Sequence, residues 1–264
     1  MTKPRSYEMR KLIFIALIGM LGYLTKATAF DANNIVLYMS FDQQPIKDFV
    51  QDHSEYGNHG TLIGKSKWVK TGKFGGALEF DGASKIEVPH SKSLNISKEI
   101  TLQVWFKTKS PQKGRFLIYK VHLGGGRNYE WGIYLTGGSK SVSMYLVEPN
   151  DTVKWVSKDG DWENNDWHFL VGTYNGKSVK CYIDGEQAEK TPLAKSARTS
   201  EGVLLIGTWG NNFFTGFLDE ARILNVALTE DMIKDEFKNG YRPFSIAAKK
   251  TWFGLGTNQI FINY

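Results

Sequence analysis

Short runs in which apolar and polar residues alternate recur along most of the chain. Residues 100–107 (Ile-Thr-Leu-Gln-Val-Trp-Phe-Lys) alternate through their first half, which is typical of a β-strand with one face in a hydrophobic core. Further strands are expected at Ile35–Phe41, Ala77–Phe80, Lys85–Val88, Arg115–Val121, Glu130–Leu135, Ser141–Val147, Lys154–Ser157, His168–Tyr174, Ser178–Ile183, Val203–Gly207 and Gly216–Leu224. This spacing predicts an all-β fold, an antiparallel two-sheet sandwich, rather than alternating strands and helices.

Turn residues separate these runs. Asn175-Gly176 joins two of them and predicts a two-residue hairpin, because both turn positions of such a hairpin need positive φ. Asp184-Gly185, Asp81-Gly82 and Gly137-Gly138 mark further reversals of the chain.

One short helix is expected near the C-terminal end of the chain. Thr229 can cap it, Glu230 and Asp231 suit its positive first turn, and Asn239-Gly240 ends it. Its apolar stripe consists of Met232, Ile233 and Phe237. A single helix after a run of strands is expected to close one end of the sandwich.

The N-terminal segment has the pattern of a signal peptide. Four basic residues precede the apolar run Leu12–Leu24, which is too short to cross a hydrocarbon core of ~30 Å as a helix. Ala27-Thr28-Ala29 then supplies small residues for signal peptidase, which predicts cleavage before Phe30 and a secreted protein. An uncleaved signal anchor is the alternative. No later run reaches ~18 consecutive apolar residues, so no membrane span is expected after residue 29.

Composition and charge remove several functional classes. Five of the 33 basic and one of the 27 acidic residues lie in 1–29, so most of the net charge of +6 belongs to the signal segment. The remainder has 28 basic and 26 acidic residues, which gives no broad electrostatic case for nucleic acid. Cys181 is the one cysteine, which excludes internal disulfides and multi-cysteine zinc sites, and it is expected in a buried strand.

Six segments in order resemble a known family. They are Leu37–Asp42, Asp52–Thr61, Gly75–Gly82, Asp166–Gly176, Phe217–Asn225 and Ala227–Thr229. Together they look like the laminin G-like jellyroll domains of the concanavalin A-like lectin superfamily, over roughly residues 35–242. The resemblance implies two antiparallel sheets packed face to face, a structural calcium in many members, and binding through a curved face or loop rim. We therefore expect a jellyroll domain at 30–242 and a tail of unknown structure at 243–264.

Glycoside hydrolases occur in this superfamily, but the acidic residues do not favour catalysis. Hydrolysis needs two carboxylates that flank the scissile bond, and on a strand they must be two or four residues apart to share a face. Asp219 and Glu220 are adjacent, so a regular strand would send them to opposite faces. Asp159, Asp161 and Glu163 have the right period, but Gly160 and the polar surroundings predict an acidic turn. We expect no enzyme.

Calcium binding is a separate possibility. Oxygen donors that lie beside turns or strand ends are Asp42, Asp52, Asn58, Asp81 and Asp219. The resemblance points to Asp42 and Asp219, because calcium in related jellyrolls ties the first strand to the last, and Asp81 is the third ligand that we predict. The alternative is that these side chains cap turns by accepting hydrogen bonds from backbone N–H groups.

Aromatic and amide side chains in predicted loops suggest where a ligand would bind. Lectin sites stack an aromatic ring on the apolar face of a sugar and use polar side chains to orient its hydroxyls. The residues predicted to bind ligand are Arg127, Asn128, Trp131, Tyr134, Trp155, Trp209 and Asn211. The leading hypothesis is a secreted, non-catalytic carbohydrate-binding module. A protein-binding or adhesive domain is the alternative, and a hydrolase or lyase is the third reading.

Overall fold

The computed structural model describes residues 31–109, 114–136 and 141–241. The predicted signal peptide at 1–29, the tail at 243–264 and the Gly137-Gly138 reversal lie outside the described residues, so these expectations stay predictions. None of the helices in the described part of the chain is long and apolar enough to cross a membrane.

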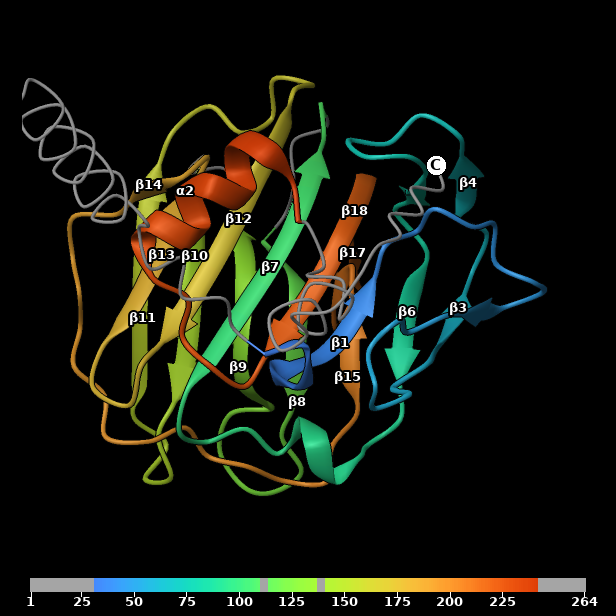
Figure 1. Ribbon diagram of the computed structural model, residues 1–264. Helices are drawn as coiled ribbons and strands as arrows, with labels where there is room; N and C mark the ends of the chain where they lie inside the picture. Colours follow the sequence, from blue (N-terminus) through green and yellow to red (C-terminus); the bar gives the residue numbers. More distant parts are fainter. Residues whose placement is uncertain (1–30, 110–113, 137–140, 242–264) are drawn as a thin grey trace, which may run out of the picture. The chain divides into compact units, whose positions relative to one another are not determined.

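The described residues form two large antiparallel sheets of eight strands each (Figure 1). The first sheet contains, in spatial order, β14 (Glu186–Gln187), β13 (Val179–Ile183), β12 (Trp167–Tyr174), β7 (Ile100–Lys107), β18 (Thr215–Leu224), β5 (Ala77–Asp81) and β4 (Lys67–Val69), and β1 (Ile35–Met39) also pairs with β18. The second contains β11 (Val153–Asp159), β10 (Ser141–Val147), β9 (Tyr129–Thr136), β8 (Arg115–Val121), β15 (Leu204–Ile206), β6 (Lys85–Val88), β3 (Gly60–Ile63) and β2 (Phe49–Val50). This arrangement confirms the predicted jellyroll sandwich.

Smaller elements complete the described chain. A two-stranded sheet consists of β16 (Thr208–Trp209) and β17 (Asn212–Phe213), and two 3-10 turns are η1 (Ala32–Asn34) and η2 (Lys92–Leu94). The strands that the sequence pattern did not predict, β2, β3, β4, β14, β16 and β17, are two to four residues long. Runs of that length contain too few residues to show a period of two.

The hydrophobic core lies between the two sheets. Leu102, Val104 and Phe106 of β7 are fully buried, as are Ile133 and Leu135 of β9 on the second sheet. Burial of each such side chain stabilises the fold by about 1.5–3 kcal/mol relative to exposure. Cys181 of β13 is buried in the same core, as predicted, and burial raises the pKa of its thiol to about 12.

One of the predicted turns forms differently. Strand β12 ends at Tyr174 and β13 begins at Val179, so the connection, residues 175–178, has four residues, and within it Gly176 alone adopts positive φ, at 80°. The two-residue turn with positive φ at both positions is instead Asp184-Gly185, at 52° and 81°, between β13 and β14. The Asn175 side chain explains the difference, because its carbonyl accepts hydrogen bonds from the Lys177 and Ser178 amides and stabilises a wider loop.

Helix α2 (Glu230–Asn239) has the predicted ends but a different position. Thr229 Oγ1 accepts a hydrogen bond from the Met232 amide, and Gly240 ends the helix with a φ of 72°. The helix does not close an end of the sandwich. It covers the outer face of the first sheet, where the Phe237 ring stacks on Trp105 of β7 at a centroid distance of 5.7 Å. The prediction was wrong because the outward side chains of β7 include this large apolar surface, which needs cover.

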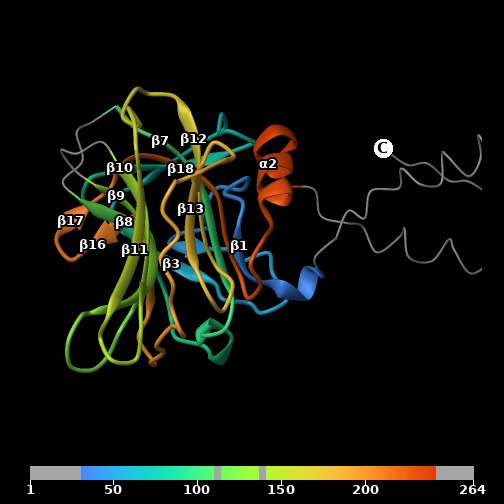
Figure 2. The same cartoon turned by 90° about the vertical axis from the view of Figure 1, so that its left-hand side faces the viewer.

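The two outer faces of the sandwich therefore differ. Figure 2 shows α2 against the first sheet, whereas the second sheet has β16 and β17 beside β8 on its outer side. Among the described residues no helix covers this second face. The second sheet thus presents an outer surface on which a ligand can lie.

Candidate functional site

Aromatic side chains lie in register across four strands of the second sheet. Tyr119 of β8 pairs with Gly132 of β9, which pairs with Tyr145 of β10, and Tyr145 pairs with Trp155 of β11. These residues face outward, because the intervening residues of β10, such as Met144, belong to the core between the sheets. In the neighbouring row Tyr134 pairs with Phe116.

Three of these rings form a continuous line with Trp209 of β16. We call the four, Trp209, Tyr134, Tyr145 and Trp155, the aromatic strip. Ring centroids are 5.7 Å apart between Trp209 and Tyr134, 5.5 Å between Tyr134 and Tyr145, and 6.2 Å between Tyr145 and Trp155. The side chain of Trp155 is 54% exposed, and the other three are partly buried. Such a line of rings on an open sheet face can stack against several units of an extended ligand.

Phe116 supports the strip from beneath. Its ring is 2% exposed and packs edge-to-face against Tyr134 at 4.9 Å, Tyr145 at 5.8 Å and Trp209 at 6.0 Å. Because Phe116 is buried, the strip rings that pack on it are ordered before a ligand binds. Binding to a pre-ordered surface loses less side-chain entropy than binding to free side chains.

Gly132 makes room for this arrangement. A Cβ atom at this position would lie 2.6 Å from Tyr119 Cβ and 2.7 Å from both the Ile118 carbonyl oxygen and Phe116 Cδ1. We expect Gly132→Ala to lower the free energy of unfolding by about 1–3 kcal/mol, since the backbone oxygen cannot move aside. Urea denaturation monitored by tryptophan fluorescence measures the change. An unchanged midpoint would show that the strand adapts without cost.

The tyrosines of this face stay protonated over the whole physiological range. Burial raises the pKa of Tyr119 and of Tyr134 to about 12, and it also raises that of Tyr145. A neutral phenol can both donate and accept a hydrogen bond, as can a sugar hydroxyl. The strip therefore combines apolar ring faces with polar tips.

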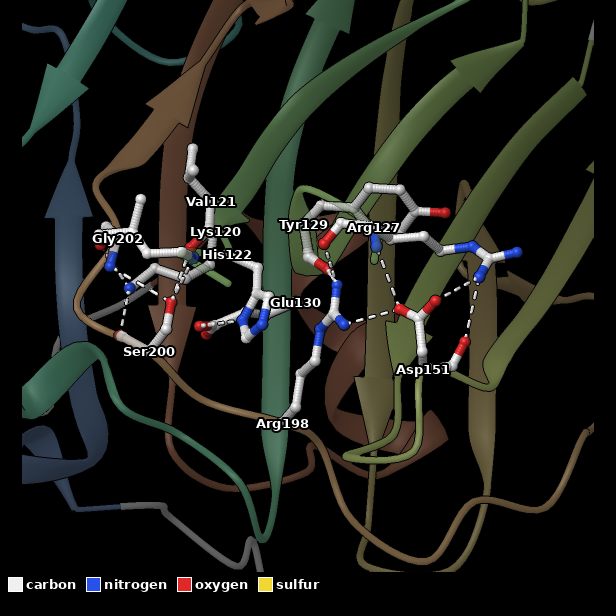
Figure 3. A network of polar contacts seen from close by, with 11 residues as sticks. Lys120, Val121, His122, Arg127, Tyr129, Glu130, Asp151, Arg198, Ser200 and Gly202 are labelled. Carbon is white, nitrogen blue, oxygen red and sulfur yellow. Dashed lines mark hydrogen bonds and ion pairs between the residues drawn. The ribbon is translucent and has the colours of Figure 1, made fainter. Parts of the chain in front are cut away.

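A cluster of charged residues surrounds Tyr129 (Figure 3), whose ring lies 6.1 Å from Tyr145 of the strip. Tyr129 packs against Phe116 at 5.2 Å, and its backbone carbonyl accepts a hydrogen bond of 2.7 Å from Arg198 Nη2. Arg198 Nη1 also donates to Asp151 Oδ1 at 2.7 Å, and Arg127 Nη1 donates to Asp151 Oδ2 at 3.0 Å. Asp151 thus joins the two arginines and fixes the loop that leads into β9.

Two further charged side chains are buried behind this cluster. Lys120 Nζ donates to the Ser200 carbonyl at 3.0 Å and also to the carbonyl of Gly202. Glu130 is fully buried, and burial raises the pKa of its carboxyl group. Its Oε1 atom lies 3.6 Å from Nδ1 of His122, whose pKa is lowered by burial and by the nearby Arg198.

The structure brings together most of the predicted ligand-binding residues. Tyr134, Trp155 and Trp209 belong to the aromatic strip, and Asn211 is exposed at the tip of the β16–β17 hairpin. Arg127 and Asn128 lie in the exposed loop before Tyr129, which neighbours Tyr145 of the strip. Strand pairing in the second sheet brings these residues together, whereas most of them are far apart in the sequence.

The prediction that Trp131 binds ligand is wrong. Its side chain is fully buried in the core between the sheets, so it cannot stack on a ligand. The strand period explains this, because Trp131 is an odd number of residues from Tyr134 and shares its face with Ile133 and Leu135. The prediction had grouped Trp131 and Tyr134 by closeness in the chain alone.

Sequence reasoning missed Tyr145, which links the two ends of the strip. The alternation Ser141, Ser143, Tyr145 along β10 places this tyrosine on the polar, outward side of the strand and could have identified it. Phe116 and Arg198 were also missed. Arg198 lies in an irregular segment without a pattern, so its partners emerge only from the folded chain.

The predicted calcium ligands do not form one site. Asp42 Oδ1 accepts a hydrogen bond from the Gly76 amide, Asp219 Oδ2 accepts from the Lys73 and Phe74 amides, and Asp81 Oδ1 accepts from the Ala83 amide and the Ser84 hydroxyl. Asp42 and Asp219 thus hold the same 72–76 loop, whereas Asp81 closes its own turn. Among the described residues no three His, Cys, Asp or Glu side chains are grouped to hold a metal ion. This arrangement does not fit calcium at Asp42, Asp81 and Asp219, although calcium binding itself stays a prediction.

Asp52 and Asn58 follow the turn-capping alternative. Asp52 is 3% exposed, and its carboxylate accepts hydrogen bonds from the amides of Tyr38, Ser54 and Asn58. The Asn58 side chain donates to the Val36 carbonyl at 2.7 Å. Both side chains therefore tie the segment before β3 to β1.

Asp219 and Glu220 occupy a β-bulge, not the regular strand that their sequence suggests. The pairing of β18 with β7 shifts between Asp219 and Arg222, and Glu220 has a φ of 52°. Burial raises the pKa of Asp219 to about 8 and that of Glu220 to about 7. Neither carboxylate faces the aromatic strip, because β18 belongs to the first sheet.

Glu220 makes stability depend on pH. Its pKa rises from an ordinary 4.5 to about 7 on folding, so its contribution is complete below about 4.5 and is lost as the pH rises through about 7. Wild-type protein should thus become less stable between pH 5 and pH 8, and Glu220→Gln should reduce that slope. Urea midpoints at several pH values provide the measurement. Equal slopes for both proteins would contradict the expectation; Asp219, which has the same sign, accounts for a remaining slope.

Comparison with known proteins identifies the family of this fold. The family model for the concanavalin A-like lectin/glucanases superfamily, Laminin_G_3, matches residues 80–234, more than half of the chain. None of the curated proteins compared with the chain matches its sequence significantly.

Solved structures share the fold at low sequence identity. Domain 4 of AbnA, an extracellular GH43 arabinanase from Geobacillus stearothermophilus solved with arabinotriose, is 20% identical with a TM-score of 0.58, and the match covers 76% of this chain and 97% of that domain. The botulinum neurotoxin D domain with N-acetylneuraminic acid is 15% identical (TM-score 0.58; 78% and 51% covered). The neurotoxin DC domain with rat synaptotagmin II is 16% identical (TM-score 0.60; 80% and 53% covered). The chain thus spans about half the length of these toxin binding domains.

Proposed function

Because this chain belongs to the concanavalin A-like lectin/glucanase superfamily, through the family of laminin G-type domains, we propose that it is a non-catalytic module that binds carbohydrate on the outer face of its second sheet. The observation that carries this proposal is the aromatic strip of Trp209, Tyr134, Tyr145 and Trp155. Fold alone would not suffice, since one fold hosts many functions.

The strip suits the chemistry of a glycan chain. A sugar ring has an apolar C–H face, which packs on an aromatic ring, and hydroxyl groups at its edge, which need hydrogen-bond partners. Successive rings of the strip can stack on successive sugars of the chain, while the phenol groups of Tyr134 and Tyr145 can donate and accept hydrogen bonds. The arabinotriose complex of the AbnA domain supports a saccharide as ligand.

The proposal includes secretion. It rests on the basic residues, the short apolar run and the small residues Ala27-Thr28-Ala29 at the N-terminal end of the sequence. The AbnA domain belongs to an extracellular arabinanase, which is consistent with a similar place of action. Detection of a mature protein that begins at Phe30, by N-terminal sequencing of culture medium, tests the cleavage.

The proposal is non-catalytic because the carboxylates with the most strongly raised pKa values lie on the wrong sheet. Asp219 is fully buried and Glu220 is 5% exposed, and both belong to β18 of the first sheet. A hydrolase needs two carboxyl groups that reach the substrate from either side of one bond. In the charged cluster beside the strip, Glu130 is buried within the sandwich and Asp151 is held by ion pairs with Arg127 and Arg198.

Protein binding is the second candidate function. Ile46, Phe49 and Ile63 are 78%, 48% and 43% exposed and lie at the opposite edge of the second sheet, on β3 and around β2. Exposed apolar side chains in one place favour contact with a protein partner. The neurotoxin DC binding domain, 53% of which the match covers, was solved in complex with rat synaptotagmin II, which is consistent with a protein partner.

A glycan and polysaccharide array tests the proposed function directly. We expect the full chain to bind a subset of polysaccharides and Trp155→Ala to lose that binding. Each array is run with calcium and again with a chelator. Loss of binding in the chelator would support a calcium site formed by residues other than Asp42, Asp81 and Asp219. Binding that persists in the chelator would show that the aromatic strip binds the glycan without calcium. Absence of binding under both conditions would overturn the carbohydrate proposal and favour a protein partner.

A further inference from the structure

A polar cleft opens beside the charged cluster that holds Tyr129. Its volume is about 500 Å³, which lies within the range of ~300–1,000 Å³ that small-ligand sites occupy. The polar side chains that line it are Ser97, His122, Asp151, Ser196, Arg198 and Thr199. The strip supplies apolar ring faces, whereas this cleft supplies hydroxyl, imidazole and charged groups.

Arg198 is fixed at the wall of the cleft. Its side chain is 5% exposed, and its two terminal nitrogens donate to Asp151 Oδ1 and to backbone carbonyls, including that of Tyr129. Its Nε–H group is buried and has no hydrogen-bond partner among the described residues. A donor without a partner is costly, and it marks a place where a further acceptor would be stabilised.

Positive charge exceeds negative charge around this cleft. Asp151 is the acidic residue in the lining, and Arg127 and Arg198 both form ion pairs with it. Lys98 and Lys195 are exposed beside the lining residues Ser97 and Ser196, and none of the described acidic residues pairs with either lysine. The carboxylate of Glu99, which follows Lys98, instead accepts a hydrogen bond from the Ala227 amide. An anionic group would be attracted to this region, most strongly at low salt.

The titratable groups that are buried behind the cleft do not cancel its excess of positive charge. Burial raises the pKa of Glu130, and Lys120 lies near it as a compensating cation. The pKa of His122 is lowered, so the imidazole facing the cleft is neutral at neutral pH and can accept or donate one hydrogen bond. Glu148 is 7% exposed, pairs with Lys154 and accepts a hydrogen bond from the Lys195 amide, so it presents little free charge.

We propose that this cleft binds the carboxylate of an acidic sugar whose neighbouring rings in the same glycan lie on the aromatic strip. This inference rests on the proposed carbohydrate function and names its ligand class, glycans with carboxylate groups. Tyr129 connects the two parts, since its backbone is held by Arg198 and its ring lies 6.1 Å from Tyr145. One chain can thus reach both surfaces.

Matched acidic and neutral ligands test the proposal. Titration calorimetry compares oligogalacturonate, oligoalginate and sialyllactose with their methyl esters, which keep the rings and remove the charge. We expect at least one acid to bind about tenfold more tightly than its ester, and the difference to shrink at high salt. Arg127→Gln and the double change Lys98→Gln with Lys195→Gln should reduce that difference by about tenfold or abolish it. These side chains are exposed, so the variants should fold normally.

Lys67→Gln is the matched control, because Lys67 is an exposed lysine on β4 of the first sheet. It should leave all affinities unchanged. Equal binding of acids and esters, or binding of none of the three acids, would overturn the cleft proposal. Ester binding that still depends on Tyr145 would leave the proposed function intact in that case. Acid binding that depends on Arg127 but not on Tyr145 would instead support the cleft and contradict the strip.

Discussion

Replacement of either Trp155 or Tyr145 by alanine should weaken glycan binding by about thirtyfold or more. Exposed and half-buried aromatic rings at the centre of a binding surface contribute about 2 kcal/mol or more each when they are the main contacts, and 1.4 kcal/mol corresponds to a factor of ten. The two rings stack at 6.2 Å with an interplanar angle of 17°, so they form one surface. Titration calorimetry with the best ligand from the array gives the loss.

Trp167→Ala is the matched control for this experiment. Trp167 is a partly buried tryptophan on β12, and it packs against Phe217 on the first sheet, at 6.3 Å. Its removal should not change glycan affinity. Equal losses from Trp155→Ala and Trp167→Ala would show that the variants act through folding, and no loss from either strip variant would place the ligand elsewhere.

Glu236→Ala should lower the free energy of unfolding by about 3–5 kcal/mol. The Glu236 carboxylate accepts hydrogen bonds of 2.7 Å from both Arg222 Nη2 and Gln103 Nε2, and Arg222 is 1% exposed. Removal of one partner leaves a buried guanidinium without its counter-charge, which costs far more than the loss of a surface ion pair. Urea denaturation gives the free energy, with the m-value as a check that the unfolding transition is unchanged.

The exposed ion pair of the same helix provides the comparison. Lys234 and Glu230 form an i,i+4 pair on the outer side of α2, and Lys234→Ala should change the urea midpoint only slightly. Glu236→Ala should leave glycan affinity of the folded protein unchanged, because α2 covers the first sheet and the strip lies on the second. A midpoint shift as small as that of Lys234→Ala would contradict a stabilising role for the buried pair.

The predicted fold rested on local patterns that tertiary contacts did not override. Ile100–Lys107, Arg115–Val121, Ser141–Val147 and Lys85–Val88 begin and end in the structure at the predicted residues. A run of apolar and β-branched residues bounded by turn residues is a property of the local sequence, so it can be recognised without the rest of the chain. The N-cap at Thr229 is likewise decided within four residues, through one hydrogen bond to the Met232 amide.

Two elements show where local patterns fail. Asp219-Glu220 reads as a regular strand, but β18 bulges there and places Glu220 in a left-handed conformation. The Asp219 carboxylate stabilises this bulge by accepting hydrogen bonds from Lys73 and Phe74, which lie about 150 residues earlier in the chain. No sequence pattern within β18 indicates that its partners are the distant Lys73 and Phe74 amides.

Strand periodicity and the order of six short segments are local features, and they were enough to predict the fold class of this protein. The candidate site, in contrast, depends on tertiary structure. Trp155, Tyr145, Tyr134 and Trp209 come from separate strands, and strand register across the second sheet makes them one surface. Register depends on the burial of whole sheet faces, because a shift of one residue would turn every side chain to the opposite side.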